Sequence, residues 1–293
     1  MTTVATTART QEAPAARPGS RRSWAWVGLL PFLIFAGLFL LLPVSFLVLG
    51  SFQDASGAAT LQNYADLSRP DIVQAFRTTI EISLVTAIVG TVLGFLIAYA
   101  VILAGLPGWL RAPLVTFAGV PLALAFIFTL GQLGIVTLWI RQTFGINIYQ
   151  QGFSLFTQTG LELVYLYFQL PLMILIIAPA IDGLKKEWRE AAENLGATSR
   201  QYWRRVAFPI LMPSLLGTAI LLFGNAFGAQ ATAYQLTGGT IPIVAVKVGA
   251  QISGDVLHNV GLGYAMAMAM VAVMSVAIGL YLWLQKRAER WMR

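Results

Sequence analysis

The chain lacks most of the side chains from which enzyme active sites and metal centres are built. Its 293 residues contain no cysteine and a single histidine, His258. A disulfide framework and a thiolate metal site are therefore excluded. Neither GxxxxGK[ST] nor HExxH occurs, so the sequence has no P-loop for nucleotide phosphates and no metalloprotease motif. Because the carboxylates are scattered, we expect no catalytic residue and no cofactor on this chain.

Charged residues are also scarce, and apolar residues dominate. Lys, Arg, Asp and Glu make up 11% of the chain, whereas hydrophobic residues make up 57%. This composition is typical of a polytopic membrane protein. A helix crosses a bilayer with roughly 20 apolar residues. We therefore predict an all-α fold with six transmembrane helices, because the apolar runs are continuous and do not alternate as barrel strands would. They lie near residues 24–50, 78–103, 113–140, 161–181, 207–235 and 262–284.

The distribution of positive charge predicts the orientation in the membrane. If the N-terminus is cytoplasmic, 15 of the 19 Lys and Arg residues fall in cytoplasmic segments. The other four, Arg69, Arg77, Arg141 and Lys247, lie outside or at the outer boundary. We therefore expect both termini in the cytoplasm. Residues 1–22 are expected to form a disordered cytoplasmic tail and residues 23–293 the membrane domain. The net charge of +7 then reflects topology rather than nucleic-acid binding.

The polar segment 183–209 separates the fourth and fifth predicted spans and has the pattern of two short helices. Good helix formers over residues 187–195 predict the first helix, and Gly196 is expected to end it in the left-handed conformation. Thr198 and Gln201 have the spacing of a capping box, which predicts a second helix after the turn.

The first of these helices has features of a docking element. Ala191 and Ala192 leave one stripe of it almost without side chains, so its backbone can approach a groove closely. Glu190 precedes them on the same helix. A charged hairpin of this kind between two apolar runs is suited to contact a partner outside the membrane.

The same residues resemble a known family motif. The family pattern is Glu-Ala-Ala, three residues, Gly, nine residues and Ile-x-Leu-Pro. Here it reads Glu190-Ala191-Ala192, Gly196 and Val206-Ala207-Phe208-Pro209, in which Val206 and Phe208 depart only by apolar exchange. The motif is similar to the cytoplasmic coupling loop of the permease subunit of binding-protein-dependent, type I ABC importers. The likeness extends from about Thr79 to the C-terminus. Residues 227–232 and 237–242 resemble the polyamine, ferric-iron and sulfate branch more than the sugar branch.

This resemblance implies a type I importer permease fold in the bacterial cytoplasmic membrane and a non-catalytic transport subunit. ATP and magnesium would be bound by a partner ATPase. The expected partners are two ATPase subunits, a second permease that we expect to be a different chain, an extracytoplasmic solute-binding protein, and membrane lipid. Coupling to the ATPase is assigned to Glu190, Ala191, Ala192, Gly196 and Pro209.

A few polar residues deep in the predicted spans are candidates for the solute path. Charged groups at a helix centre cost roughly 2.5 to 3.5 kcal/mol, so polar side chains there should face a cavity or a neighbouring helix. The resemblance implies a large contribution of the fifth span to the pore, which selects Asn225 and Gln230. Gln132 and Glu81 are the next candidates for the solute path. For each residue, the alternative is a hydrogen bond inside the helix bundle.

The sequence leaves more than one cargo open, and two other classes of membrane protein have to be considered. Glu81 and acidic residues on the outer side favour a cation such as a polyamine, while a sugar, a phosphonate or ferric ion stays open. A self-contained channel or secondary transporter would need ion-coupling carboxylates or a pair of broken helices at mid-membrane. The sequence indicates no such pair. A membrane enzyme acting on lipid would need His, Asp or Glu clustered at one interface, which is not visible.

Overall fold

The structure, a computed structural model, describes residues 28–103, 119–253 and 259–290. The predicted tail, residues 1–22, lies outside the described residues. Within these ranges the secondary structure is helical apart from one isolated bridge between Gln53 and Ala59. The described part contains six helical stretches that are long and apolar enough to cross a membrane: Gly28–Ser51, Pro70–Ile102, Val120–Phe144, Gln158–Asp182, Ser199–Phe227 and Val260–Arg287. The predicted fold class and the number of spans are confirmed.

The chain divides into two compact units after Phe46. The first unit contains α1 (Leu30–Ala36), the π-helical η2 (Gly37–Leu41) and the start of α2 (Leu42–Ser51). The rings of Phe35 and Phe39 lie 4.8 Å apart. No residue of α1 or η2 is buried, although nearly all are apolar. Such a surface is stable only in an apolar environment such as lipid.

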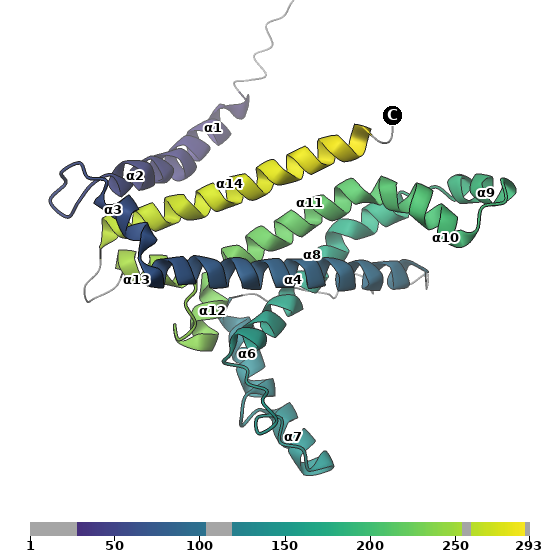
Figure 1. Cartoon of the computed structure of the whole chain (residues 1–293), viewed down its shortest axis with the longest axis horizontal. Coiled ribbons are helices and arrows are strands. Elements are labelled where there is room, and N and C mark those ends of the chain that lie inside the picture. Colours follow the sequence, from purple (N-terminus) through teal and green to yellow (C-terminus); the bar gives the residue numbers. More distant parts are fainter. Residues whose placement is uncertain (1–27, 104–118, 254–258, 291–293) are drawn as a thin grey trace, which may run out of the picture. The chain divides into compact units, whose positions relative to one another are not determined.

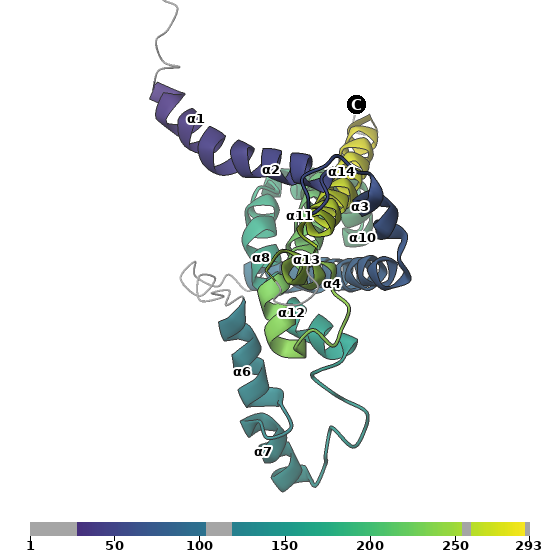
Figure 2. The same ribbon diagram turned by 90° about the vertical axis from the view of Figure 1, so that its left-hand side faces the viewer.

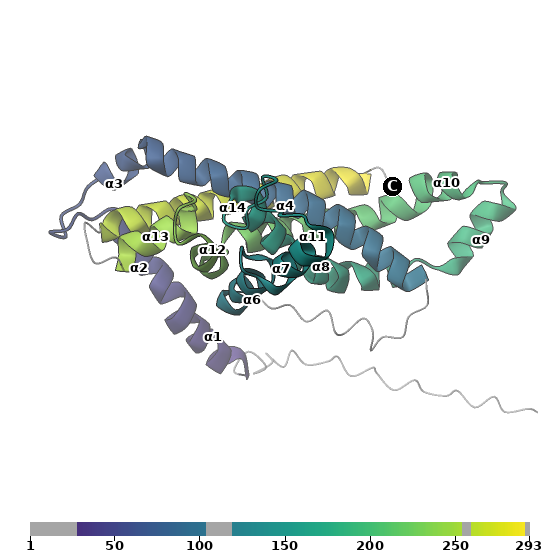
Figure 3. The same cartoon turned by 90° about the horizontal axis from the view of Figure 1, so that it is seen from below.

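The second unit contains the other five spans. The helices α4, α11 and α14 run alongside one another, and α8 crosses against α4 and α11 (Figure 1). α6 and α7 lead away from this group (Figure 2). α9 and α10 lie at one end of the unit, and α3 and α13 lie towards the other (Figure 3). The elements are α3 (Gln62–Ala65), η3 (Asp66–Ser68), α4 (Pro70–Leu103), α6 (Val120–Leu130), α7 (Ile135–Phe144), α8 (Gln158–Asp182), α9 (Lys186–Asn194), α10 (Ser199–Tyr202), η4 (Trp203–Ala207), α11 (Phe208–Phe227), α12 (Gln230–Thr237), α13 (Val244–Ser253) and α14 (Val260–Arg290).

Small residues and one buried amide allow α4 and α8 to pack closely. A Cβ added at Gly94 of α4 would lie 2.5 Å from Cγ of the fully buried Met173 on α8. One turn away, Nε2 of the buried Gln169 donates to Oγ1 of Thr86 over 3.1 Å. Close approach without a Cβ is the usual means of packing helices in a membrane. α4 is therefore held tightly along its middle.

Two of the predicted apolar runs are interrupted in the structure. The third span breaks between Leu130 and Ile135, where the chain turns through Gly131 and Gly134. Residues 113–118 of that prediction lie outside the described residues. The fifth span, predicted over 207–235, breaks at Gly228 and Ala229 between α11 and α12. Apolar residues continue on both sides of each break, so hydropathy gives no sign of the interruptions.

Candidate functional site

The polar segment 183–209 folds as the sequence predicts. α9 ends at a Schellman motif, in which Gly196 N–H donates to Glu193 O and Ala197 N–H donates to Ala192 O, each over 2.9 Å. Gly196 has a φ of +77°, which confirms the predicted left-handed conformation. A side chain at this φ is strained, so glycine is favoured.

The second helix of the segment starts with the predicted capping box. Thr198 N–H donates to Oε1 of Gln201 over 2.7 Å, and Gln201 N–H donates to Oγ1 of Thr198 over 3.3 Å. These bonds satisfy backbone donors that would otherwise lack partners at the start of a helix. The turn and the cap together fix the angle between α9 and α10.

α9 buries none of its side chains. Arg189 Nε contacts Glu193 Oε1 at 2.9 Å, and this hydrogen bond, with the charge of the carboxylate, raises the pKa of Arg189 above its usual value. Glu190 forms no ion pair with the described residues. Its carboxylate is therefore available to a positively charged partner.

A hollow lies beside the turn between the two helices. Its volume is about 320 Å³. Leu195, at its rim, is 88% exposed, which is an unusual position for a leucine unless a partner covers it. The wall combines apolar and polar side chains, namely Ala192, Leu195, Gly196, Ala197, Gln201, Tyr202, Arg205 and Val206. This combination suits a protein surface.

The second half of the segment is anchored to the membrane helices by aromatic rings. The Trp203 ring lies 4.9 Å from the Tyr99 ring and 6.4 Å from the Phe95 ring, both on α4, and the two contacts are edge-to-face. Tyr202 is 7% exposed and Ala207 is fully buried. We did not predict this contact from the sequence. The closely spaced Tyr202 and Trp203 in a charged segment were the available signal.

Pro209 is the second residue of α11, which continues from α10 through the π-helical η4 without a break, so its missing N–H falls directly after the π-helical turn. The predicted coupling residues thus lie along one continuous path. Glu190, Ala191 and Ala192 are on α9, Gly196 is in the turn, and Pro209 is the second residue of α11.

All four predicted solute-path residues are exposed on the single chain. Gln132 lies in the break between α6 and α7, and Asn225 and Gln230 flank the break between α11 and α12. Glu81 lies on α4 and pairs with Arg77 at 2.7 Å. Three of the four therefore lie at or next to an interrupted helix. Irregular backbone at membrane depth is tolerated where it faces protein or a water-filled cavity.

Gln230 also contacts a helix that the sequence did not predict. A Cβ added at Gly249 of α13 would collide with Nε2 of Gln230, so the amide lies directly over the α13 backbone. Asn225 shares an exposed stripe of α11 with Leu221, one turn away. Neither Asn225 nor Gln230 is buried inside the helix bundle, whereas Gln169 is.

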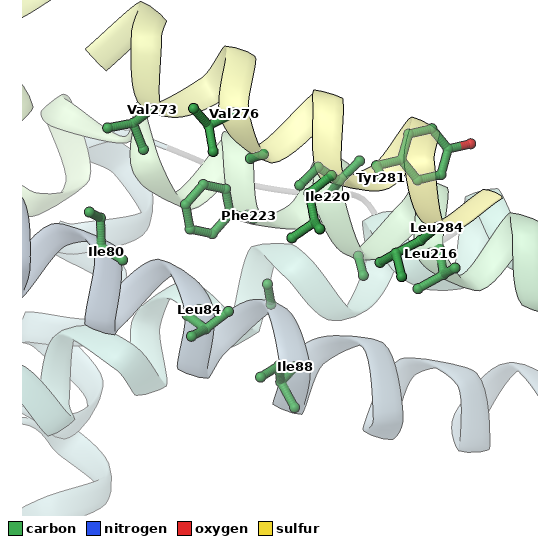
Figure 4. Close-up of a pocket in the computed structure, with 14 residues that line it drawn as sticks. Ile80, Leu84, Ile88, Leu216, Ile220, Phe223, Val273, Val276, Tyr281 and Leu284 are labelled. Atoms are coloured by element: carbon green, nitrogen blue, oxygen red, sulfur yellow. The ribbon is translucent and has the colours of Figure 1, made fainter. Parts of the chain in front are cut away.

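A groove of about 380 Å³ between α4, α11 and α14 has a different character (Figure 4). Ile80, Ile220 and Val276 point into it from the three helices. Of its fourteen lining residues, only Tyr281 has a polar side chain. The groove therefore suits an apolar neighbour and offers nothing to a charged solute. Within the described residues, no group of three or more His, Cys, Asp or Glu side chains is placed to hold a metal ion.

Comparison with known proteins identifies the family. Residues 90–290 match the family described as the inner membrane component of binding-protein-dependent transport systems. The chain belongs to this family. It is 29% identical over 203 residues to the sulfate transport system permease protein CysT of Salmonella typhimurium, covering 67% of this chain and 69% of that protein. CysW of Escherichia coli K12 is 27% identical over 233 residues, covering 77% and 75%. The trehalose permease SugB of Mycobacterium tuberculosis is 29% identical over 197 residues, covering 67% and 66%.

Solved structures show the same fold. A bacterial ABC transporter that imports alginate matches with a TM-score of 0.70 at 16% identity, over 91% of this chain and 96% of that chain. The methionine transporter MetNI matches with a TM-score of 0.52 at 16% identity, over 74% and 95%. The resemblance inferred from the Glu190 motif is thus confirmed. This chain is a multi-pass inner-membrane permease subunit of an ABC importer. It is not an enzyme, and ATP hydrolysis takes place on a partner ATPase.

Proposed function

We propose that a separate ATPase drives this permease through the loop 183–209, with ATP and magnesium bound on that ATPase. The observation that carries the proposal is that no side chain of α9 is buried. Glu190, Ala191 and Ala192 would contact the ATPase, Gly196 fixes the turn, and Pro209 lies near the start of α11, the helix that would move. Because each of the two permease subunits has to be driven by an ATPase, two ATPase subunits are expected, one for each permease.

The loop and both chain termini are assigned to the cytoplasm. α9 and α10 lie at the same end of the second unit as the C-terminal end of α14 (Figure 1). Positive side chains gather at that end, namely Lys185, Lys186, Arg189, Arg200, Arg204, Arg205, Lys286 and Arg287. Cytoplasmic segments of membrane proteins are enriched in Lys and Arg, which supports this orientation.

A second permease is proposed to complete the solute path. Gln132, Asn225 and Gln230 are exposed on one chain and lie at helix interruptions, so a partner across the path would enclose them. The Escherichia coli K12 relatives CysT and CysW are named as two different permease proteins of a sulfate transport system. This supports a heterodimer. The family's dependence on a binding protein supports delivery of solute at the opposite, outer face.

For the cargo we propose a small oxyanion of the sulfate class. The polyamine expectation finds no support, because the relatives named for sulfate include both CysT and CysW. The chemistry of the path agrees. Gln132, Asn225 and Gln230 offer amide N–H donors, and Glu81, the one carboxylate among the four, is neutralised by Arg77. The 29% identity to the trehalose permease SugB makes a sugar the second candidate.

Uptake by whole cells tests the cargo. A strain lacking this permease is complemented with the wild-type gene, and accumulation of radiolabelled sulfate, putrescine and trehalose is measured separately. Restored sulfate uptake that excess unlabelled sulfate abolishes, and that excess putrescine does not, is the expected result. Restoration of putrescine or trehalose uptake alone would overturn the oxyanion assignment. Purification of the permease from the same cells is expected to recover an ATPase subunit in equal amount.

A further inference from the structure

The two spans that continue directly from the loop 183–209 are each weakened by proline. α8 leads into the loop and contains Pro171 and Pro179 within the helix, and α11 leads out of it and contains Pro213. Each internal proline removes a backbone hydrogen bond and favours a kink. Movement at the loop is therefore partly absorbed within these helices before it reaches their far ends.

α4 has no such weak point, although it is not joined to the loop by the chain. Its 34 residues contain proline only at the first position, Pro70. Gly90 and Gly94, its two interior glycines, are held against Gln169 and Met173 of α8. At 1.5 Å per residue, the helix between Thr79 and Tyr99 is about 30 Å long. α4 thus has the stiffness and the length to connect the two ends of the unit.

At the loop end, α4 is held by Trp203. The Trp203 ring packs edge-to-face against Tyr99 at 4.9 Å, and Phe95 and Tyr99, one turn apart, complete the cluster with ring centroids 6.5 Å apart. Trp203 begins the π-helical turn η4, which Phe208 N–H closes by donating to Trp203 O. π-helical turns are rare and occur often at functional sites. The turn changes the helical register between α10 and α11 at the residue that contacts α4.

At the opposite end, α4 is bonded to α13. Thr79 Oγ1 accepts a hydrogen bond of 2.9 Å from Val244 N–H, the first residue of α13, and both residues are buried. Asp71 Oδ2 pairs with Lys247 Nζ at 2.8 Å. α13 in turn contacts the amide of Gln230 through Gly249, and Gln230 is a proposed solute-path residue.

We propose that α4 transmits the movement of the loop 183–209 to α13 and hence to Gln230, with Trp203 as the positioning residue at the loop. The inference rests on the proposed coupling function. It adds a second route beside α8 and α11, which the chain itself connects. The aromatic contact is suited to this role because edge-to-face packing is a favoured arrangement of rings and stabilises the contact beyond the apolar area it buries.

The test measures solute uptake and ATP hydrolysis together, in proteoliposomes that contain the whole importer with its ATPase and binding protein. Trp203→Ala is expected to lower uptake per ATP hydrolysed about threefold to tenfold, while ATP hydrolysis is retained. Trp203→Phe keeps a ring and should recover most of the ratio. Trp283→Ala is the matched control, since that tryptophan is 55% exposed on α14 and should leave the ratio unchanged. A wild-type ratio in Trp203→Ala would overturn the proposal.

Spin labels separate transmission from folding. This chain has no cysteine, so a single introduced cysteine is the only labelling site on the permease, which is labelled before it is assembled with its partners. In the wild-type complex, ATP should change the spectra of labels at Asn194→Cys on α9 and Ser253→Cys on α13. Trp203→Ala should preserve the change at residue 194 and abolish it at residue 253. An unaltered change at residue 253 would contradict a role for α4.

A double-mutant cycle tests whether both ends act on one route. Lys247→Ala removes the ion pair with Asp71 and is expected to lower uptake per ATP about twofold. Combined with Trp203→Ala, it should cause no further loss, because the route is already broken. If the double variant instead loses uptake per ATP by the product of the two single losses, the two contacts act on separate routes and the inference is overturned. If Glu190→Lys also leaves uptake intact, the coupling function itself fails; if only Trp203→Ala does, the fault lies with α4.

Discussion

The two halves of the loop 183–209 have opposite environments although they are adjacent in sequence. On α9 no residue is buried, and Leu195 at its end is 88% exposed. On the other side of Gly196, Tyr202 is 7% exposed and Trp203 packs into the aromatic cluster with α4. The first half therefore buries none of its side chains, whereas the second half buries Tyr202 and Ala207 and partly buries Trp203 in its own protein.

This difference shows how a short segment can act as a connector. A surface that docks a partner must stay free of intramolecular contacts, whereas a surface that transfers force must be packed. Gly196 separates the two surfaces, and the capping box at Thr198 fixes the start of the second. The following variants act on one half at a time.

The largest effect is expected where the halves join. Gly196→Val places a β-branched side chain at a φ of +77°, which costs about 1–3 kcal/mol and should reorient α9. Uptake should fall about tenfold or more, while insertion into the membrane stays normal. Uptake is measured in cells and insertion by the amount of permease in washed membranes.

Gly196→Asn is the matched control, because asparagine tolerates the left-handed conformation better than other side chains do. It should retain most of the uptake. Equal activity of the Val and Asn variants would show that the angle between the two halves is unimportant for coupling.

A smaller effect is expected from a charge reversal on the exposed half. Glu190→Lys disturbs no intramolecular ion pair, so the permease should keep its stability. Binding to the ATPase should weaken about threefold to tenfold, because an interface charge is reversed. Titration of purified ATPase against the permease in nanodiscs measures this.

Asp66→Lys reverses a charge at the other end of the unit, on η3, and should leave ATPase binding unchanged. Normal affinity in Glu190→Lys would remove this residue from the docking surface. Loss of affinity in Asp66→Lys would show that the assay reports total charge instead of the interface.

The smallest effect is expected from the cap of the second half. Thr198→Ala removes the hydroxyl that accepts from Gln201 N–H, which costs about 1 kcal/mol of local stability. Amide exchange at Arg200 and Gln201 should quicken about fivefold, while amides in α4 keep their rates. Thr198→Ser keeps the hydroxyl and should exchange at the wild-type rate. Unchanged exchange in the alanine variant would show that packing of Trp203 alone holds α10.

Much of this could be predicted from residues that act locally. The left-handed Gly196 and the Thr198 and Gln201 cap depend on neighbouring backbone groups, and both were confirmed. The six spans followed from length and hydropathy. The breaks at Gly131–Gly134 and at Gly228 were missed, because apolar residues continue on both sides and glycine also occurs inside intact membrane helices such as α4.

Other features depend on residues far apart in the chain. Neither the spacing nor the type of Tyr99 indicates that it meets Trp203, 104 positions later, and Thr79 gives no sign of its bond to Val244. The polar residues of the spans illustrate the same limit. Gln169 is buried in a bond to Thr86, whereas Gln230 is exposed beside α13, although both are glutamines in apolar surroundings.

The sequence by itself determined that the chain crosses the membrane as six helices. It also determined that two short helices joined at Gly196 lie between the fourth and fifth spans. These properties arise from the cost of burying polar groups in lipid and from bonds within a few residues. Only the tertiary structure decided which side of the hairpin is packed, where spans break, and which helix the loop holds. Those outcomes depend on shape complementarity between distant segments, which no local pattern encodes.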